Sequence, residues 1–331
     1  MNASIAAFAC AALLLAADAP PGEQIFRAKT DAVRVDVLVT SGNKPIGGLT
    51  ATDFEILDNG VPQVIDNVSI EEVPFSMLLL LDTSASMEGS NLNDLKSAAT
   101  AAIETMGTGD KAAIMTFSDV LRQVSPWRAK GEELTRAIAG LRASGATALF
   151  DAAFAGLNMR DPDPARRGLV LLFSDGEDTS SWLPAAAAVD KAGRTDAVVY
   201  SVVLGAPIGR SADQERAAVA RSTPGAPAAN MDQGARRRLF FRSGVTLSPG
   251  APLIEQSPVL PELAERTGGE ALRAEISGKL RETFEHIVTD FRSRYLLSYV
   301  PKGVDTPGWH KIEVKVKGRR AAVKARRGYE R

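Results

Sequence analysis

The sequence predicts an α/β fold in which a doubly wound, mostly parallel sheet carries a small all-β domain. Four long apolar runs are typical of strands buried on both faces of a parallel sheet, and segments with helical periodicity separate them. Stretches of period-two alternation lie before and after this region. The four runs span residues 75–81, 111–118, 167–176 and 196–205.

The N-terminus has the features of a signal peptide over residues 1–19. Ile5 to Ala17 is an unbroken run of apolar and small residues, too short to span a bilayer, and Ala17-Asp18-Ala19 forms an A-x-A cleavage pattern. A short buried helix is the alternative. The single cysteine, Cys10, lies inside this run, so the mature chain would have neither disulfides nor cysteine metal ligands.

The flanks at 28–72 and 293–331 read as β structure. Valines alternate with polar residues over 33–39, and Asn59-Gly60 forms a turn signal between two short strands. Three further strands are expected at 294–300, 310–318 and 321–329. Because chain termini often lie close together, we expect the two flanks to pair into one small β domain.

Residues 75–292 hold the α/β region, interrupted by an insertion at 205–257. Helices are expected at 92–106, 132–141, 148–158, 184–193 and 276–291. The insertion is rich in Pro, Gly, Ala, Ser and Arg and has no clean period. We expect it either to shape the ligand-binding edge and contact a partner around Arg236, Phe240 and Phe241, or to be a disordered loop.

Five oxygen-bearing side chains are expected at the carboxyl edge of the sheet, where open α/β sheets bind ligands. They comprise two carboxylates and three hydroxyls, with no His or Cys nearby in sequence, a donor set that suits Mg²⁺. For each residue, a helix cap or a turn is the competing interpretation. The five residues are Asp82, Ser84, Ser86, Thr147 and Asp175.

Asp82-Thr83-Ser84-Ala85-Ser86 resembles the D-x-S-x-S signature of von Willebrand factor A-type domains, and Thr147 and Asp175 match the family's later threonine and aspartate. The resemblance covers residues 75–292 apart from the insertion. It implies a Rossmann-like domain whose metal-ion-dependent adhesion site holds Mg²⁺, with Mn²⁺ or Ca²⁺ as alternatives.

The resemblance also implies roles for the site residues. Ser84 and Ser86 would bind the ion directly, and the other three would bind it directly or through water. An Asp or Glu from a protein partner would complete the coordination. The flanks are similar to those of bacterial exported VWFA-related proteins, which are frequent in acidobacteria and have no defined biochemical role.

The expected function is therefore an exported, metal-dependent adhesion or assembly module, periplasmic or extracellular, and not an enzyme. In a second reading, the ion only stabilises a structural domain of an envelope assembly. A hydrolase is a remote alternative, because a serine nucleophile needs a histidine base and the chain has only His286 and His310. Glu177 and Asp178, which follow Asp175 closely, are interpreted as surface-loop charges, with tuning of the site as the alternative.

Charge patterning points to no further class of partner. The net charge of −1 gives no sign of nucleic-acid binding. We interpret the nine basic residues of 311–331 as a solvated strand face in preference to a surface that binds an anionic glycan, lipid or nucleic acid, and no membrane contact is expected beyond the signal peptide.

Overall fold

The computed structural model describes residues 32–42, 44–70, 73–205, 259–275 and 279–331. The predicted signal peptide and the predicted insertion beyond Gly205 lie outside the described residues.

A six-stranded sheet forms the α/β region, with strand order β11-β10-β9-β6-β7-β8. The first five strands in this order pair in parallel, as predicted, and β8 pairs antiparallel with β7. The strands are β6 (Phe75–Asp82), β7 (Lys111–Phe117), β8 (Leu121–Arg128), β9 (Arg167–Ser174), β10 (Val198–Gly205) and β11 (Ala271–Glu275).

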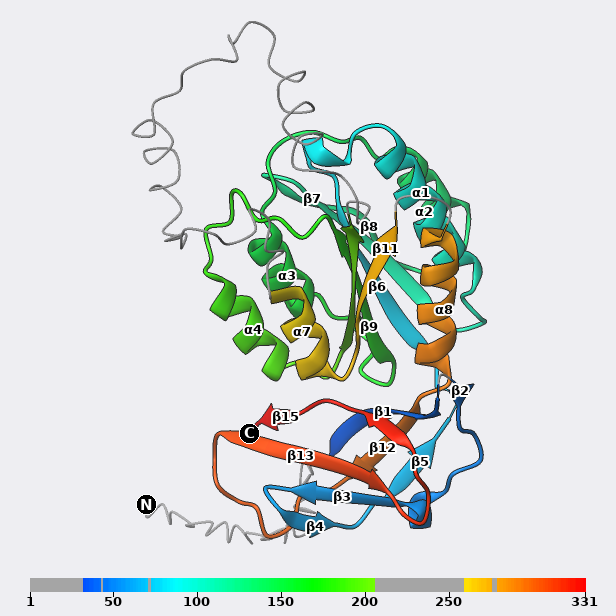
Figure 1. Cartoon of the computed structure of the whole chain (residues 1–331), viewed down its shortest axis with the longest axis vertical. Helices are drawn as coiled ribbons and strands as arrows, with labels where there is room; N and C mark the ends of the chain where they lie inside the picture. The colour runs from blue at the N-terminus through cyan, green and yellow to red at the C-terminus, as the bar shows by residue number, and fades with distance from the viewer. Residues whose placement is uncertain (1–31, 43, 71–72, 206–258, 276–278) are drawn as a thin grey trace, which may run out of the picture. The chain divides into compact units, whose positions relative to one another are not determined.

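Helices cover both faces of this sheet, which confirms the doubly wound prediction (Figure 1). One face carries α1 (Ser90–Glu104), α2 (Glu132–Ala139) and α8 (Leu280–Arg292). The other carries α3 (Leu149–Asn158), α4 (Ala185–Gly193) and α7 (Val259–Thr267). Of the helices within the described ranges, none is long and apolar enough to cross a membrane.

The apolar side chains of β6 pack against helices on both faces of the sheet. Leu79 and Leu81 pack in the core under α1 and α8, whereas Leu78 and Leu80 pack in the core under α3 and α4. Every residue of β6 is buried. This two-sided burial explains why the strand has no polar alternation.

Strand β8 and the start of α8 differ from the sequence-based expectation. The run Leu121–Arg128 is mostly exposed and contains Pro126, so it lacks the apolar pattern of the other strands. It forms an edge strand, where a proline is tolerated because no neighbour needs its N–H. The final helix was expected from Ile276, but Ile276 lies outside the described residues and α8 begins at Leu280.

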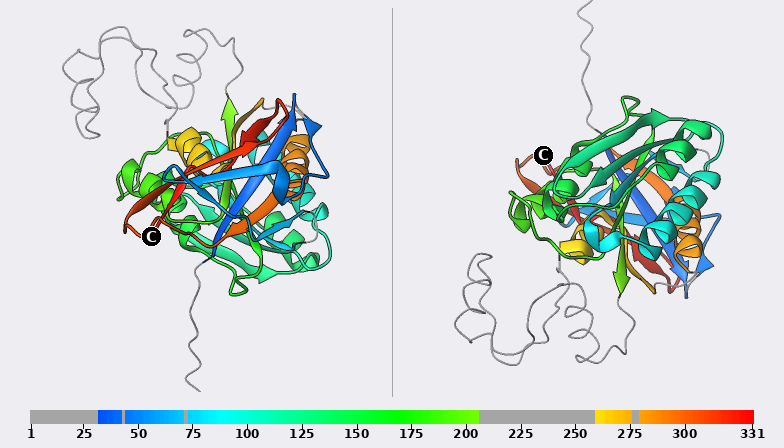
Figure 2. Two further views of the ribbon diagram at one scale, coloured as in Figure 1. Left: turned by 90° about the horizontal axis from the view of Figure 1, so that it is seen from below. Right: turned by 90° about the horizontal axis from the view of Figure 1, so that it is seen from above.

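The two flanks pair with each other, which confirms the predicted β domain. β1 (Val33–Ser41) pairs with β12 (Tyr295–Tyr299) and β14 (Ala322–Lys324), and β3 (Phe54–Asp58) pairs with β13 (Trp309–Val316). Figure 2 shows the blue strands of the N-terminal flank interleaved with the orange-to-red strands of the C-terminal flank. The remaining short strands are β2 (Lys44–Pro45), β4 (Val61–Gln63), β5 (Asn67–Ser69) and β15 (Gly328–Glu330).

Two local features of the flanks bear on the sequence predictions. Asn59 and Gly60 both have positive φ, 47° and 82°, as the predicted hairpin turn requires. The strand expected at 321–329 is two short strands, β14 and β15, on different sheets.

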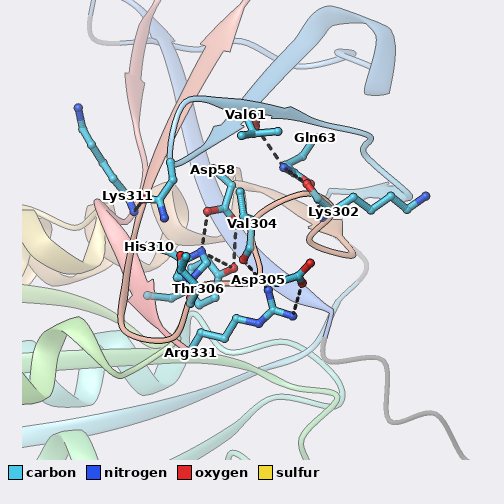
Figure 3. A network of polar contacts seen from close by, with 12 residues as sticks. Asp58, Val61, Gln63, Lys302, Val304, Asp305, Thr306, His310, Lys311 and Arg331 are labelled. Carbon is cyan, nitrogen blue, oxygen red and sulfur yellow. Dashed lines mark hydrogen bonds and ion pairs between the residues drawn. The ribbon is translucent and has the colours of Figure 1, made fainter.

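The β domain encloses a cluster of buried polar side chains. Asp58 accepts hydrogen bonds from Tyr299 at 3.0 Å and Tyr329 at 2.8 Å, and its other oxygen lies 2.9 Å from Nδ1 of His310. Nε2 of His310 lies 2.7 Å from the carbonyl oxygen of Thr306 (Figure 3). Burial and the neighbouring Asp58 raise the pKa of Tyr299 and of Tyr329, so both phenols stay protonated and donate.

A buried ion pair joins β1 to β9. Asp36 is paired with Arg167, whose guanidinium also donates to the carbonyl of Phe291 at 3.1 Å. Both charged side chains are almost completely buried. Asp36, which the alternation of β1 places on the polar face, is therefore covered by the protein.

Candidate metal site

The site is built where β6 and β9 end side by side. Leu81 and Phe173 are register partners in these parallel strands, so Asp82 and Ser174 follow at the same level. The hydroxyl of Ser174 donates to Oδ2 of Asp82 at 2.7 Å. Asp175 comes next in the chain, at the carboxyl edge of the sheet.

Hydrogen bonds bring four of the five predicted residues together. The backbone N–H of Ser84 donates to Oδ1 of Asp82 at 2.9 Å. The hydroxyl oxygens of Ser84 and Ser86 lie 3.0 Å apart, and Ser86 donates to Oδ2 of Asp175 at 2.5 Å. The D-x-S-x-S loop and the residue after β9 thus form one connected group of oxygens.

The loop that carries Thr147 is bonded to both of these segments. Gly145 accepts from the N–H of Ala85 at 2.9 Å, which ties the loop to the D-x-S-x-S segment. The carbonyl of Thr147 accepts from the N–H groups of Thr179 and Ser180 at 2.8 and 2.9 Å, which ties it to the segment after Asp175. Thr147 itself is buried.

The site is deep at one end and open at the other. Asp82 is fully buried, and Ser84 and Thr147 are nearly so. Asp175 is half-buried and Ser86 is exposed. A ligand arriving from solvent would therefore meet Ser86 and Asp175 first.

Burial dominates the electrostatics of the site. It raises the pKa of Asp82 from 3.8 to about 6, because removal from water disfavours the charged carboxylate. Hydrogen bonds from Ser84 and Ser174 oppose this shift, and the negative charge of Asp175 adds to it. A buried carboxylate beside a second negative charge is a setting in which a bound cation would be stabilising.

The donor set fits a hard divalent cation. Within the described residues no group of three or more His, Cys, Asp or Glu side chains is placed to hold a metal. Hydroxyls must therefore complete any coordination at this edge. Mg²⁺ accepts such oxygen ligands and retains several waters, so two carboxylates and a few hydroxyls are sufficient.

Side-chain capping does not account for these residues: Ser84 is the N-cap residue of a short 3-10 helix (Ala85–Met87), but its side chain makes no capping hydrogen bond. The N-cap of α1 is Gly89, and no side chain caps that helix. The N-cap residue of α3 is Ala148, so Thr147 is not the cap of that helix either. Asp175 does accept from the N–H of Glu177 at 3.1 Å, so its turn role coexists with its place in the site.

Asp178 has a structural role that the sequence interpretation missed. Its Oδ1 accepts from the N–H of Leu149 at 2.8 Å and from the hydroxyl of Ser181 at 2.5 Å, so it holds the N-terminus of α3. Reading it as a surface-loop charge was therefore wrong. The hydrogen bond from Ser174 to Asp82 was not predicted either, because a single serine at the end of a buried strand matches no sequence motif.

The histidines lie elsewhere. His286 is on α8, exposed and 3.4 Å from Asp290, and His310 is in the buried cluster of the β domain. Neither can serve Ser84 or Ser86 as a base. The predicted partner contacts Arg236, Phe240 and Phe241 lie outside the described residues.

The fold and the oxygen-lined edge define a doubly wound domain of the von Willebrand A class. Residues 77–177 match the family profile of the von Willebrand factor type A domain. This match places a von Willebrand factor type A domain in the part of the chain that forms the six-stranded sheet. Such domains are protein-interaction or adhesion modules. No curated protein matches the sequence.

Solved structures with a similar fold are distant in sequence. An aerotolerance-related membrane protein of Bacteroides fragilis is 15% identical over 66% of this chain and 98% of its own, with a TM-score of 0.44. A von Willebrand factor type A protein of Catenulispora acidiphila is 12% identical over 87% and 75%, with a TM-score of 0.45. The mussel byssus proximal thread matrix protein 1, with a zinc-occupied MIDAS motif, is 13% identical over 71% and 49%, with a TM-score of 0.45.

Proposed function

We propose that the chain is an exported, metal-ion-dependent protein-binding module. The observation that carries this proposal is the hydrogen-bonded convergence of Asp82, Ser84, Ser86 and Asp175 at the carboxyl edge, with Thr147 on the adjoining loop. Ser84 and Ser86 bind Mg²⁺ directly, and Asp82, Thr147 and Asp175 bind it directly or through water. Mn²⁺ and Ca²⁺ are alternative ions.

A carboxylate of a protein partner completes the coordination. The opening of the site beside Ser86 and Asp175 supports this step, because it leaves the ion accessible from solvent. With few protein charges around it, the bound ion keeps enough positive character to attract an Asp or Glu. Export rests on the N-terminal sequence, whose apolar run and A-x-A pattern are those of a secretory signal.

We also propose a non-enzymatic role, which the positions of the two histidines support. A serine nucleophile requires a base within hydrogen-bond reach, and both histidines of the chain are engaged elsewhere.

Calorimetry tests metal binding. Wild-type protein should bind Mg²⁺, and Asp82→Ala should abolish binding while the circular dichroism spectrum is preserved. Glu88→Ala is the matched control, because Glu88 is an exposed carboxylate in the loop that follows Ser86. Undiminished Mg²⁺ binding by Asp82→Ala contradicts the assignment.

A second candidate is a structural domain in which the ion only stabilises an assembly. The burial of Asp82 favours this candidate, because a bound cation would offset the free-energy cost of burying the charged carboxylate and so stabilise the fold. Pull-down from an envelope extract in Mg²⁺ and in EDTA separates the two. Adhesion is supported if EDTA releases a partner from the wild-type protein and Mg²⁺ restores its binding. Asp175→Ala should not bind this partner in Mg²⁺.

A further inference from the structure

Trp182 is an exposed side chain with no structural role of its own. It is 95% exposed, and no other large hydrophobic side chain in the described ranges is as accessible; Val64 follows at 68%. An indole carries a large apolar surface, and leaving it in water forgoes the favourable free energy of burial. The exposed indole therefore offers an apolar surface that a partner could cover.

The backbone beneath Trp182 is held firmly. Asp151 on α3 accepts from the N–H of Trp182 at 2.9 Å and from the N–H of Leu183 at 2.8 Å. The preceding Ser181 donates to Asp178 and accepts from the N–H of Phe150 at 3.0 Å. The indole is therefore presented from a fixed loop, so that little backbone entropy would be lost when it is covered.

This loop adjoins the candidate metal site. Thr179 and Ser180 donate to the carbonyl of Thr147. Trp182 is two residues further on, so its Cα lies within about 7 Å of that of Ser180. A partner of ordinary interface size that reaches the ion would also cover this position.

The charges around the site restrict what the partner can carry. Exposed acidic side chains lie on three loops of this edge, at Glu88, Asp119 and Glu177, whereas the exposed basic residue Arg142 lies on a fourth, the described loop that carries Thr147. A strongly acidic partner would be repelled by this field. A segment that offers one carboxylate among apolar and basic side chains would be accepted.

We infer that Trp182 is the apolar anchor of the partner-binding surface, and that the partner is a segment of another protein with a single Asp or Glu beside an apolar residue. This inference rests on the proposed metal-dependent binding. Trp residues with these properties are common among the few side chains that dominate protein interfaces.

The test uses the purified protein and a display library of 12-residue peptides with a fixed central Asp or Ala and randomised flanks. Selection in Mg²⁺ should enrich the Asp peptides, with apolar residues next to the Asp. For the best peptide, Trp182→Ala should weaken Kd at least tenfold, whereas Trp182→Phe and the distant control Val64→Ala should change it less than threefold. Peptide binding should shift the tryptophan emission of wild type to the blue, but not that of Trp182→Phe.

The outcomes separate the two proposals. If Asp peptides are selected in Mg²⁺ and lost in EDTA, but Trp182→Ala binds them within twofold of wild type, the inference about Trp182 is wrong and the metal-dependent function stands. If Asp peptides have no advantage over Ala peptides in Mg²⁺, the proposed function fails and the inference fails with it.

Discussion

Ser86 donates a 2.5 Å hydrogen bond to Asp175, although 89 positions separate the two residues in the chain. The bond closes the group of oxygens at the carboxyl edge, because Ser86 belongs to the loop after β6 and Asp175 to the segment after β9. A short bond from a hydroxyl to a carboxylate is strong and charge-assisted. The two residues therefore act as one unit.

This pairing predicts non-additive effects on metal affinity. Ser86→Ala and Asp175→Ala should each weaken Mg²⁺ binding by at least tenfold. The double variant should lose less than the sum of the two free energies, because each single change already breaks the shared arrangement. Titration calorimetry on all four proteins measures the coupling. Strict additivity would mean that the two residues contribute independently.

The pKa of Asp82 predicts how stability depends on pH. Below pH 3.8 the carboxyl is protonated in both folded and unfolded chains. As the pH rises, the unfolded chain loses the proton first, while the folded metal-free protein retains it up to about pH 6. The free energy of unfolding should therefore fall between about pH 4 and pH 6, by about 3 kcal/mol from this residue.

Asp82→Asn isolates this contribution. The amide is neutral at every pH, so the metal-free variant should be more stable than metal-free wild type at pH 8 and of similar stability at pH 4. Urea unfolding in EDTA at the two pH values measures the difference. Mg²⁺ should stabilise wild type only, and increasingly as the pH rises through 6, because the ion competes with the proton. A pH-independent difference between the two proteins would contradict this account.

Gly145 predicts a steric requirement in the loop of Thr147. It has a φ of 83°, and a Cβ built on it would lie 2.1 Å from Oδ1 of Asp119. Gly145→Ala should therefore push the exposed Asp119 carboxylate aside and strain the loop at a positive φ, which should weaken Mg²⁺ binding severalfold. Gly89→Ala is the matched control at the same edge, since Gly89 has a φ of 85° but no atom within 4 Å of the added Cβ. Equal losses in both variants would assign the effect to backbone strain alone.

The Asp58 cluster predicts a stability effect without a binding effect. Asp58→Ala would leave the hydroxyls of Tyr299 and Tyr329 and Nδ1 of His310 without their buried acceptor. The loss should be at least about 3 kcal/mol, because each of these three buried polar groups costs about 1–3 kcal/mol when it is left without its partner. Tyr329→Phe, which removes one donor, should cost about 1 kcal/mol. Urea unfolding measures both, and the Mg²⁺ affinity of folded Tyr329→Phe should equal that of wild type.

Much of the fold could be predicted because burial leaves a periodic pattern in the sequence. Continuous apolar runs indicate that β6 and β9 are buried on both faces of the sheet. The apolar stripe of α8 indicates which side of that helix packs against the sheet. β8 could not be predicted, because an exposed edge strand has no such pattern. The pairing of β1 with β12 was inferred only from the position of both flanks outside the α/β region.

The sequence by itself determined the kind of chemistry available: two carboxylates and three hydroxyls at strand ends, no cysteine after Cys10, and histidines outside the motif. The tertiary structure decided the rest, because contacts between distant segments leave no periodic signal. Only the folded chain shows that Ser174 supports Asp82, that Asp178 holds α3, and that His310 is buried against Asp58. It also distinguishes Trp182, exposed on a fixed loop, from Trp127, which packs against the core.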